Sequence, residues 1–187
     1  MSNKKIDFSK QIAQTLDDIR VELLDEFDRN FERKAFFSKA WQRKRPGYRA
    51  NKPLLLDTGN LRRSIRAHTT RNSVVFTANE PYAAIHNYGG TITVTRKMKG
   101  YFWYKYKEAI GGFGYTKKGA MRNDAKNRAI SSEAQFYRAM ALQKVGSKIK
   151  IPKRQFIGVA PEVEKAVREI VEWNLYQFVN NIDITFK

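Results

Sequence analysis

The stretch at residues 9–33 reads SKQIAQTLDDIRVELLDEFDRNFER, and its apolar side chains recur at spacings of four and three. The recurring positions are Ile12, Leu16, Ile19, Leu23, Phe27 and Phe31. In a helix these positions share one face, which can bury against other elements. The acidic residues between them lie mostly off this face and are expected to be solvated. The stretch therefore predicts a long amphipathic helix with Ser9 as its N-cap.

A second long helix is predicted near the C-terminus, from about Pro161 to Asn180. Its broad, mostly apolar face is made by Val163, Val167, Ile170, Val171, Asn174, Leu175 and Phe178. Glu162 and Glu164 suit the positive end of its dipole. The two long helices are therefore expected to enclose the core of the fold.

Residues 36–65 lack a clear period at first and then favour a short helix. Phe36, Phe37 and Trp41 are expected to be aromatic anchors, and residues 43–47 (RKRPG) are expected to form a turn or loop. A short helix is expected to follow, with Asp57 or Thr58 as its candidate N-cap. Leu61 and Ile65 share an apolar face of this helix.

Strands and one more short helix complete the pattern. The extended candidates are residues 66–70, 73–77, 91–95 and 149–151. Arg71 and Asn72 have the length of a two-residue hairpin turn between the first two. The short helix opens at Pro81 and is stopped by Gly89 and Gly90. The order of elements predicts an α+β fold, with a small, mainly antiparallel sheet packed by the N-terminal and C-terminal helices in a single domain over residues 1–187.

Positive charge is concentrated in one segment of the chain. The chain has 36 Lys and Arg against 18 Asp and Glu, a formal net charge of +18. Residues 88–154 hold 16 of the basic residues and 3 of the acidic ones. Such a segment indicates a loop or arm with its own contacts rather than general adhesion to polyanions. Residues 96–150 are therefore predicted to be a long basic and aromatic insertion or arm within the domain.

The aromatic part of this insertion allows two interpretations. Rings interleaved with lysines can stack bases and neutralise phosphates. The candidate contacts to DNA or to a partner are Lys97, Lys99, Tyr101, Trp103, Lys105 and Lys107. The favoured alternative is a strand whose alternate rings pack on a partner subunit while its lysines face water. Farther on, a helix is predicted with Ser131 or Ser132 as its cap and its end near Lys144.

The sequence shows no pattern typical of an enzyme or a metal site. It has no cysteine, which excludes a disulfide, a thiolate zinc site and a cysteine nucleophile. His68 and His86 lack a Gly-x-Ser-x-Gly elbow and the spacing of metal ligands. Asp124 and Lys126 have the spacing for half of a nuclease site, but partner carboxylates are missing nearby. We therefore expect no catalytic activity, no metal and no cofactor.

A membrane location is also not expected. No apolar run is longer than four residues, whereas a bilayer-spanning helix needs about 20. The first five residues, MSNKK, are not followed by the apolar stretch of a secretory signal. The sequence therefore predicts a soluble protein without a membrane partner.

Three short stretches, taken in order, resemble a known family. They read LDTGNLRRSI at residues 56–65, PYAAIHNYGG at 81–90 and IPKRQFIG at 151–158. They are similar to the phage virion morphogenesis proteins, the Mu G-like and P2 S-like tail completion family, whose pattern is roughly L-x-x-T/S-G-x-L-x-x-S-I, Y-A-x-x-H-x-x-G and I-P-x-R-x-F-h-G. The resemblance covers most of residues 9–95 and 150–180. The segment between them is longer than the family leads one to expect.

The resemblance implies a structural virion protein that completes the tail or neck of a tailed phage and joins head to tail. It implies a protein without enzyme activity. It also implies a homo-oligomeric ring, contacts with other neck, connector or tail proteins, and a place in the virion after assembly in the host cytoplasm. Arginine and aromatic residues dominate interface cores, so the candidate interface residues are Tyr82, His86, Arg154 and Phe156. The insertion is expected to cover a neighbouring subunit, to reach another neck protein or to make non-specific contact with genomic DNA. The alternative function is a non-virion nucleic-acid-binding protein that uses residues 96–150.

Overall fold

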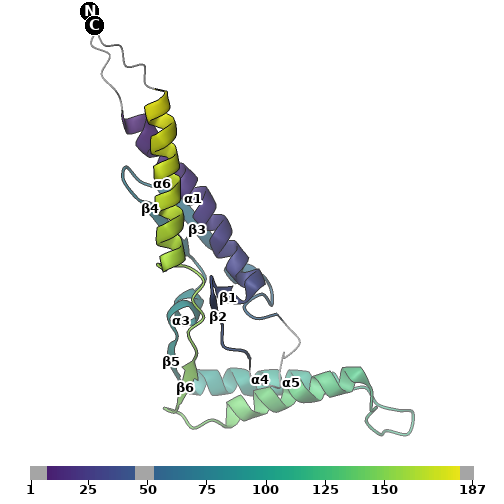
Figure 1. Ribbon diagram of the computed structural model, residues 1–187. Helices are drawn as coiled ribbons and strands as arrows, with labels where there is room; N and C mark the ends of the chain where they lie inside the picture. The colour runs from purple at the N-terminus through teal and green to yellow at the C-terminus, as the bar shows by residue number, and fades with distance from the viewer. Residues whose placement is uncertain (1–7, 45–52, 182–187) are drawn as a thin grey trace, which may run out of the picture. The chain divides into compact units, whose positions relative to one another are not determined.

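The computed structural model describes residues 8–44 and 53–181, and these residues form two compact units (Figure 1). Of the described residues, 8–41, 58–88 and 154–181 make the first unit, and 42–44, 53–57 and 89–153 make the second. Helices and antiparallel strand pairs occur in the described residues of both. The predicted α+β class is confirmed. Its strands form three separate two-stranded ladders rather than one sheet.

The first unit is built on two long helices that lie side by side (Figure 1). Its elements are α1 (Phe8–Arg33), β1 (Ala35–Phe36), β2 (Lys39–Ala40), α2 (Asn60–Arg63), β3 (Ile65–Thr69), β4 (Val74–Ala78), α3 (Ala83–Tyr88) and α6 (Pro161–Asn180). The predicted range of α6 is confirmed. Helix α1 already includes Phe8, so the expected N-cap at Ser9 is wrong by at least one residue. The loop expected over residues 43–47 lies mostly outside the described residues.

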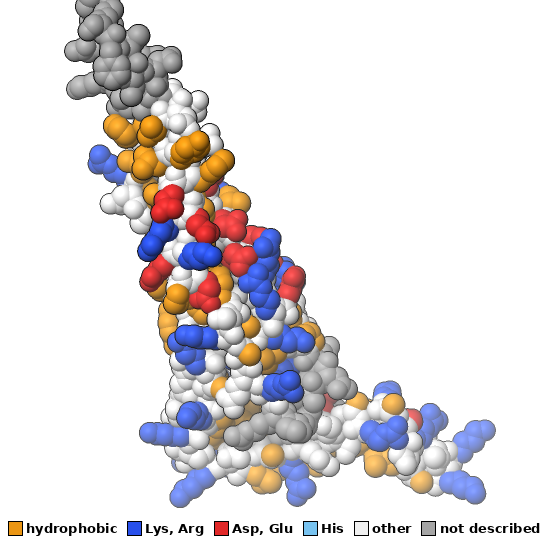
Figure 2. All heavy atoms as spheres, viewed as in Figure 1, with side chains coloured by type: hydrophobic (Ala, Val, Ile, Leu, Met, Phe, Trp, Pro, Cys, Tyr) orange, Lys and Arg blue, Asp and Glu red, His pale blue; other side chains and the backbone are white. Residues whose placement is uncertain are grey.

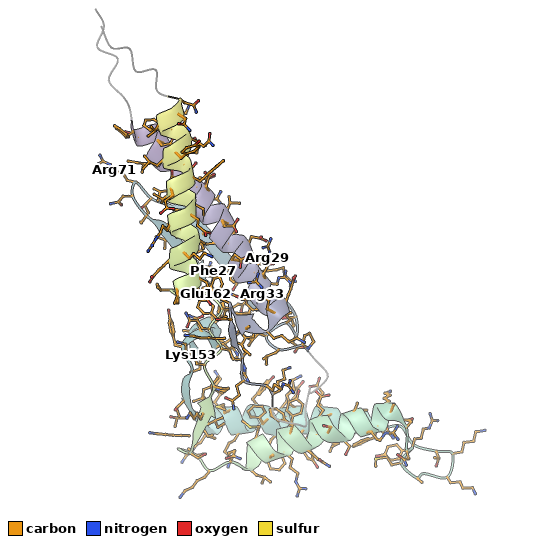
Figure 3. All side chains as sticks on the ribbon, viewed as in Figure 1. Phe27, Arg29, Arg33, Arg71, Lys153 and Glu162 are labelled. Carbon is orange, nitrogen blue, oxygen red and sulfur yellow. The ribbon has the colours of Figure 1, made fainter. Side chains whose placement is uncertain are left out.

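The core of this unit follows the apolar face of α1. Ile19, Leu23 and Phe27 are buried together with Phe36 of β1. The side chains packed around them come from β4, α6 and their neighbours: Phe37, Val74, Phe76, Ile157, Ala160, Val163, Ala166, Val167 and Ile170. Phe27 points from α1 toward this cluster, and its ring meets that of Phe76 edge-on at 5.1 Å (Figure 3). The spacing that predicted the helix therefore also selected its buried face.

The β3–β4 hairpin confirms the predicted pairing. Its register runs from Ile65 opposite Ala78 to Thr69 opposite Val74. Arg71 lies in the connecting turn, at the tip of the hairpin (Figure 3). The backbone N–H of Thr70 donates to the carbonyl of Ser73 at 2.8 Å, which closes the turn without the usual Asn-Gly pair.

The second unit explains how a long insertion leaves and rejoins the chain. Strands β5 (Gly90–Thr93) and β6 (Lys148–Ile151) pair antiparallel, with Thr93 opposite Lys148. Beyond this ladder the backbone groups of Val94 bond to Gly146 and Ser147 at 2.9 Å. The ends of the intervening segment therefore meet, and that segment forms a hairpin of α4 (Arg96–Gly111) and α5 (Ala125–Leu142) (Figure 1).

Two sequence-based expectations about the insertion are wrong. Residues 101–107 are helical rather than extended, because Thr95 caps α4 by accepting a hydrogen bond from the backbone N–H of Met98 at 3.1 Å. Helix α5 starts at Ala125 rather than at the predicted serines, because the Asp124 side chain accepts a hydrogen bond from the N–H of Asn127 at 2.8 Å. Aromatic packing joins the two helices: the ring of Phe102 lies 6.1 Å from that of Phe136.

Candidate functional site

The second and third of the quoted stretches meet at the C-terminal end of α3. Asn87 is 3% exposed, and its Oδ1 accepts hydrogen bonds from the backbone N–H groups of Phe156 at 2.9 Å and Ile157 at 3.2 Å. The N–H of Arg154 donates to the carbonyl of His86 at 2.7 Å. One short helix therefore anchors the extended segment 154–157.

Helix α1 and its neighbour Trp41 hold the same segment from other directions. Asn30 is fully buried; its Nδ2 donates to the carbonyl of Phe156 at 3.3 Å, and its Oδ1 accepts from the N–H of Phe37 at 2.9 Å. The indole N–H of Trp41 donates to the carbonyl of Gln155 at 2.6 Å. The Phe156 ring packs on Phe31, with 5.4 Å between centroids. Segment 154–157 is thereby fixed by both hydrogen bonds and burial.

Replacing Asn87 by alanine is expected to lower the free energy of unfolding by about 2–3 kcal/mol, because the buried N–H of Phe156 and the part-buried N–H of Ile157 lose their acceptor. Chemical denaturation followed by circular dichroism measures this change. The matched control is Asn180→Ala, which removes an exposed amide from the end of α6 and is expected to change stability by less than about 0.5 kcal/mol. Equal effects of the two variants would contradict the anchoring role.

The first quoted stretch contacts α1 instead. Arg62 of α2 forms a two-pronged ion pair with Asp28 and a further bond to Glu32 at 2.8 Å. These carboxylates raise the pKa of Arg62 above its ordinary value. Gly59 is the N-cap residue of α2 and has a φ of 73°, a left-handed conformation that glycine adopts readily. This stretch therefore fixes α2 against the long helix.

His86 is half-buried beside Arg154, and these surroundings favour the neutral form of its imidazole. Its Nδ1 atom is buried and has no hydrogen-bond partner among the described residues. Burial, and secondly the positive charge of Arg154, lower the pKa of His86 below its ordinary value of 6.5. Burial also lowers the pKa of Arg154. The pair therefore opposes protonation of the imidazole.

This environment predicts a loss of stability in weak acid. The unfolded chain binds more protons than the folded one between the lowered pKa of His86 and 6.5. The stability that the neutral His86 contributes is therefore fully present above about pH 6.5, and it is lost as the pH falls from 6.5 toward the lowered pKa. Unfolding free energies at pH 5.5 and 7.5 are expected to differ less in His86→Gln than in the parent. His68→Gln, at an exposed strand position, is the control, and an unchanged pH slope in His86→Gln would refute the role.

The α4–α5 hairpin carries the basic aromatic residues singled out in the sequence. Its helical spacing separates them into two stripes: Lys97, Tyr101 and Tyr104 in one, and Lys99, Trp103 and Lys107 in the other. Lys105 pairs with Glu108 at 2.6 Å. Figure 2 shows Lys and Arg side chains along this hairpin, whereas acidic side chains gather over α1 and α6. The six predicted contact residues thus do not share one face.

A comparison with models of protein families identifies the family of this chain. The model of the phage virion morphogenesis family matches residues 9–176. The chain belongs to this family. The matched range spans most of both long helices and the segment that holds the α4–α5 hairpin. No curated protein and no solved structure gives a significant match.

Membership in the phage virion morphogenesis family gives the protein a structural or assembly role in the virion. Among residues 8–44 and 53–181, no three His, Asp or Glu side chains gather as possible ligands of a metal ion. Asp124, the half nuclease site of the sequence analysis, is occupied as the N-cap of α5. None of the described helices is long and apolar enough to cross a bilayer.

The four interface candidates differ in how far their side chains are exposed. Phe156 is fully buried, and Arg154 nearly so. His86 is half-buried, and Tyr82 is exposed beside it, with 6.0 Å between the two rings. Phe156 therefore supports the fold, and Tyr82, at 39% exposure, is the one exposed residue of the four.

Sequence reasoning missed the two buried asparagines of this site, Asn30 and Asn87. Asn30 lies on the apolar face of α1 between Phe27 and Phe31, where an amide needs buried partners. An asparagine among the apolar positions of a predicted helix was therefore the signal in the sequence that could have identified Asn30. Asn87 had a weaker signal, since it stands only two residues before a glycine that stops a helix.

Proposed function

We propose that the protein is a ring-forming subunit that completes the phage tail or neck and joins the head to the tail. One observation carries the proposal: a group of large apolar side chains is exposed on one end of the α1–α6 pair. They are Phe8, Ile12, Val171, Trp173, Leu175, Tyr176 and Val179. Figure 2 shows apolar side chains gathered there. Exposed apolar surface of this kind is typical of proteins that assemble.

Family membership supports the virion setting, and the fold supplies dissimilar surfaces for a ring. A ring is a heterologous assembly, in which one surface of a subunit meets a different surface of the next. The first unit offers apolar and acidic surface on its long helices, and the second offers a basic helical hairpin. A single subunit therefore has two surfaces of opposite character.

Mass measurement tests the proposal. The purified protein is examined by light scattering and negative-stain imaging, alone and after mixing with isolated tails. We expect a closed ring, either free or at one end of the tails. A protein that stays monomeric and binds neither tails nor heads, but shifts with DNA at physiological salt, would contradict it and favour the nucleic-acid alternative.

A further inference from the structure

A groove between α1 and α6 in the first unit has an apolar floor and an acidic rim. Its volume is about 600 Å³. The floor is made by Val21, Ala166, Ile170 and Trp173, and the carboxylates at the rim are Asp18, Glu22 and Glu169. None of the lining residues is basic. The groove therefore favours a ligand that combines apolar surface with positive charge.

This groove is open, and its charge is only partly neutralised within the subunit. Val21 is 54% exposed and Trp173 is 62% exposed. Glu22 has no ion-pair partner among the described residues, and Glu169 meets Lys165 at 3.6 Å, with both side chains in solvent. Asp18 accepts a hydrogen bond from the Asn174 amide, which leaves its charge in place.

A ridge of complementary chemistry lies on α4 in the second unit. Lys97, Tyr101 and Tyr104 follow at i, i+4 and i+7, and the two tyrosines are 54% and 63% exposed. The Nζ of Lys105 lies 5.9 Å from the centroid of the Tyr104 ring and also holds Glu108. The only acidic side chain of α4 is therefore already paired.

We propose that the α4 ridge of one copy docks into the α1–α6 groove of the next copy. The tyrosines cover the apolar floor, and the lysines meet the rim carboxylates, a combination that gives both burial and orientation. Because the ridge and the groove are different surfaces, the contact is head to tail and can be repeated around a ring. The inference rests on the proposed function and names the interface that the ring would use.

A disulfide experiment tests this contact directly, because the chain has no cysteine of its own. Full-length Tyr104→Cys and Trp173→Cys are mixed under mild oxidation, with and without isolated tails. We expect a disulfide-linked heterodimer from the mixture and much less product from either variant alone. The control replaces Tyr104→Cys by Arg128→Cys, an exposed position on α5, which is expected to give no heterodimer with Trp173→Cys.

Absence of the heterodimer in both conditions would overturn the proposal. So would a double variant, Tyr104→Cys with Trp173→Cys, that closes only within one chain. The proposed function has a separate readout, the joining of heads to tails by the unmodified protein. Joining without cross-linking would refute the interface alone, whereas absence of joining would refute the function.

Charge reversal gives a second, independent test. Glu22→Lys with Glu169→Lys alters the groove, and Lys97→Glu with Lys105→Glu alters the ridge on α4. Each charge-reversed pair is placed in the matching cysteine variant and is expected to lower the yield of the heterodimer at least about tenfold. Combining the two charge-reversed proteins is expected to restore the yield. Circular dichroism checks that each variant folds. If the lysine pair abolishes DNA binding but leaves cross-linking unchanged, α4 serves nucleic acid and the proposal fails.

Discussion

Replacing Phe27 by alanine is expected to lower the free energy of unfolding by about 3–5 kcal/mol. The Phe27 ring is 2% exposed and lies against three other phenylalanine rings, at 5.1 Å from Phe76 and at 6.3 Å from both Phe36 and Phe37. Its removal leaves a cavity where α1, β1 and β4 meet. Chemical denaturation of the purified variant measures the loss.

The matched control for this prediction is Phe8→Ala on the same helix. Phe8 is half exposed and has a ring contact with Phe178 at 5.2 Å. Its removal is expected to cost less than about 1 kcal/mol, since little buried area is lost. Similar losses in the two variants would show that Phe27 is not at the centre of the core.

Replacing Gly89 by alanine is expected to cost about 3 kcal/mol or more and to disturb the β5–β6 ladder. Gly89 has φ of 72°, and a Cβ there would lie 2.8 Å from the backbone N of Lys153. The left-handed conformation costs a non-glycine residue about 1–2 kcal/mol. The clash with backbone adds an overpacking cost of about 1–3 kcal/mol. Faster hydrogen exchange of the ladder amides from Gly90 to Thr93 is the expected sign.

Gly100→Ala is the control for this glycine. Gly100 lies inside α4, and a Cβ there meets no atom within 4 Å. Alanine at this position is expected to stabilise the protein by about 0.5–1 kcal/mol, because glycine is a poor helix former. Normal exchange in the ladder of Gly89→Ala would contradict the steric account.

The fold could be predicted where one physical signal dominated. The four-and-three spacing from Ile12 to Phe31 gave α1 and its buried face, and Pro161 with two following glutamates gave the start of α6. The β3–β4 hairpin followed from two extended runs around Arg71 and Asn72. In each case the local preference and the burial agree.

The insertion could not be predicted as well, because its aromatic run satisfies two patterns. Tyr101 to Lys107 alternates enough to suggest a strand, yet Thr95 caps it as a helix and Phe102 buries against α5. Cap geometry and a distant partner decide this choice, and neither is visible in a short window. The pairing of β5 with β6 is also non-local, since it closes a long segment.

The sequence singled out residues of the candidate site, but it did not predict that the stretches that hold them meet. The stretches around His86 and Phe156 meet, as Asn87 and the backbone of segment 154–157 show. The interface role predicted for Phe156 rests on residue type alone, and the structure shows that its ring is buried in the core of the first unit. Residue type indicates what a side chain favours, and burial decides which partner it meets.

The joining of heads to tails is the most direct measurement of the central claim. Cells infected with a phage that lacks this gene are lysed, and the purified protein is added to the lysate, with the Phe27→Ala protein as a misfolding control. We predict that the lysate contains DNA-filled heads and separate tails, and that the protein raises the infectious titre by orders of magnitude. A lysate that already contains complete infectious phage, or one whose heads and tails stay separate after addition of the protein, would contradict the account.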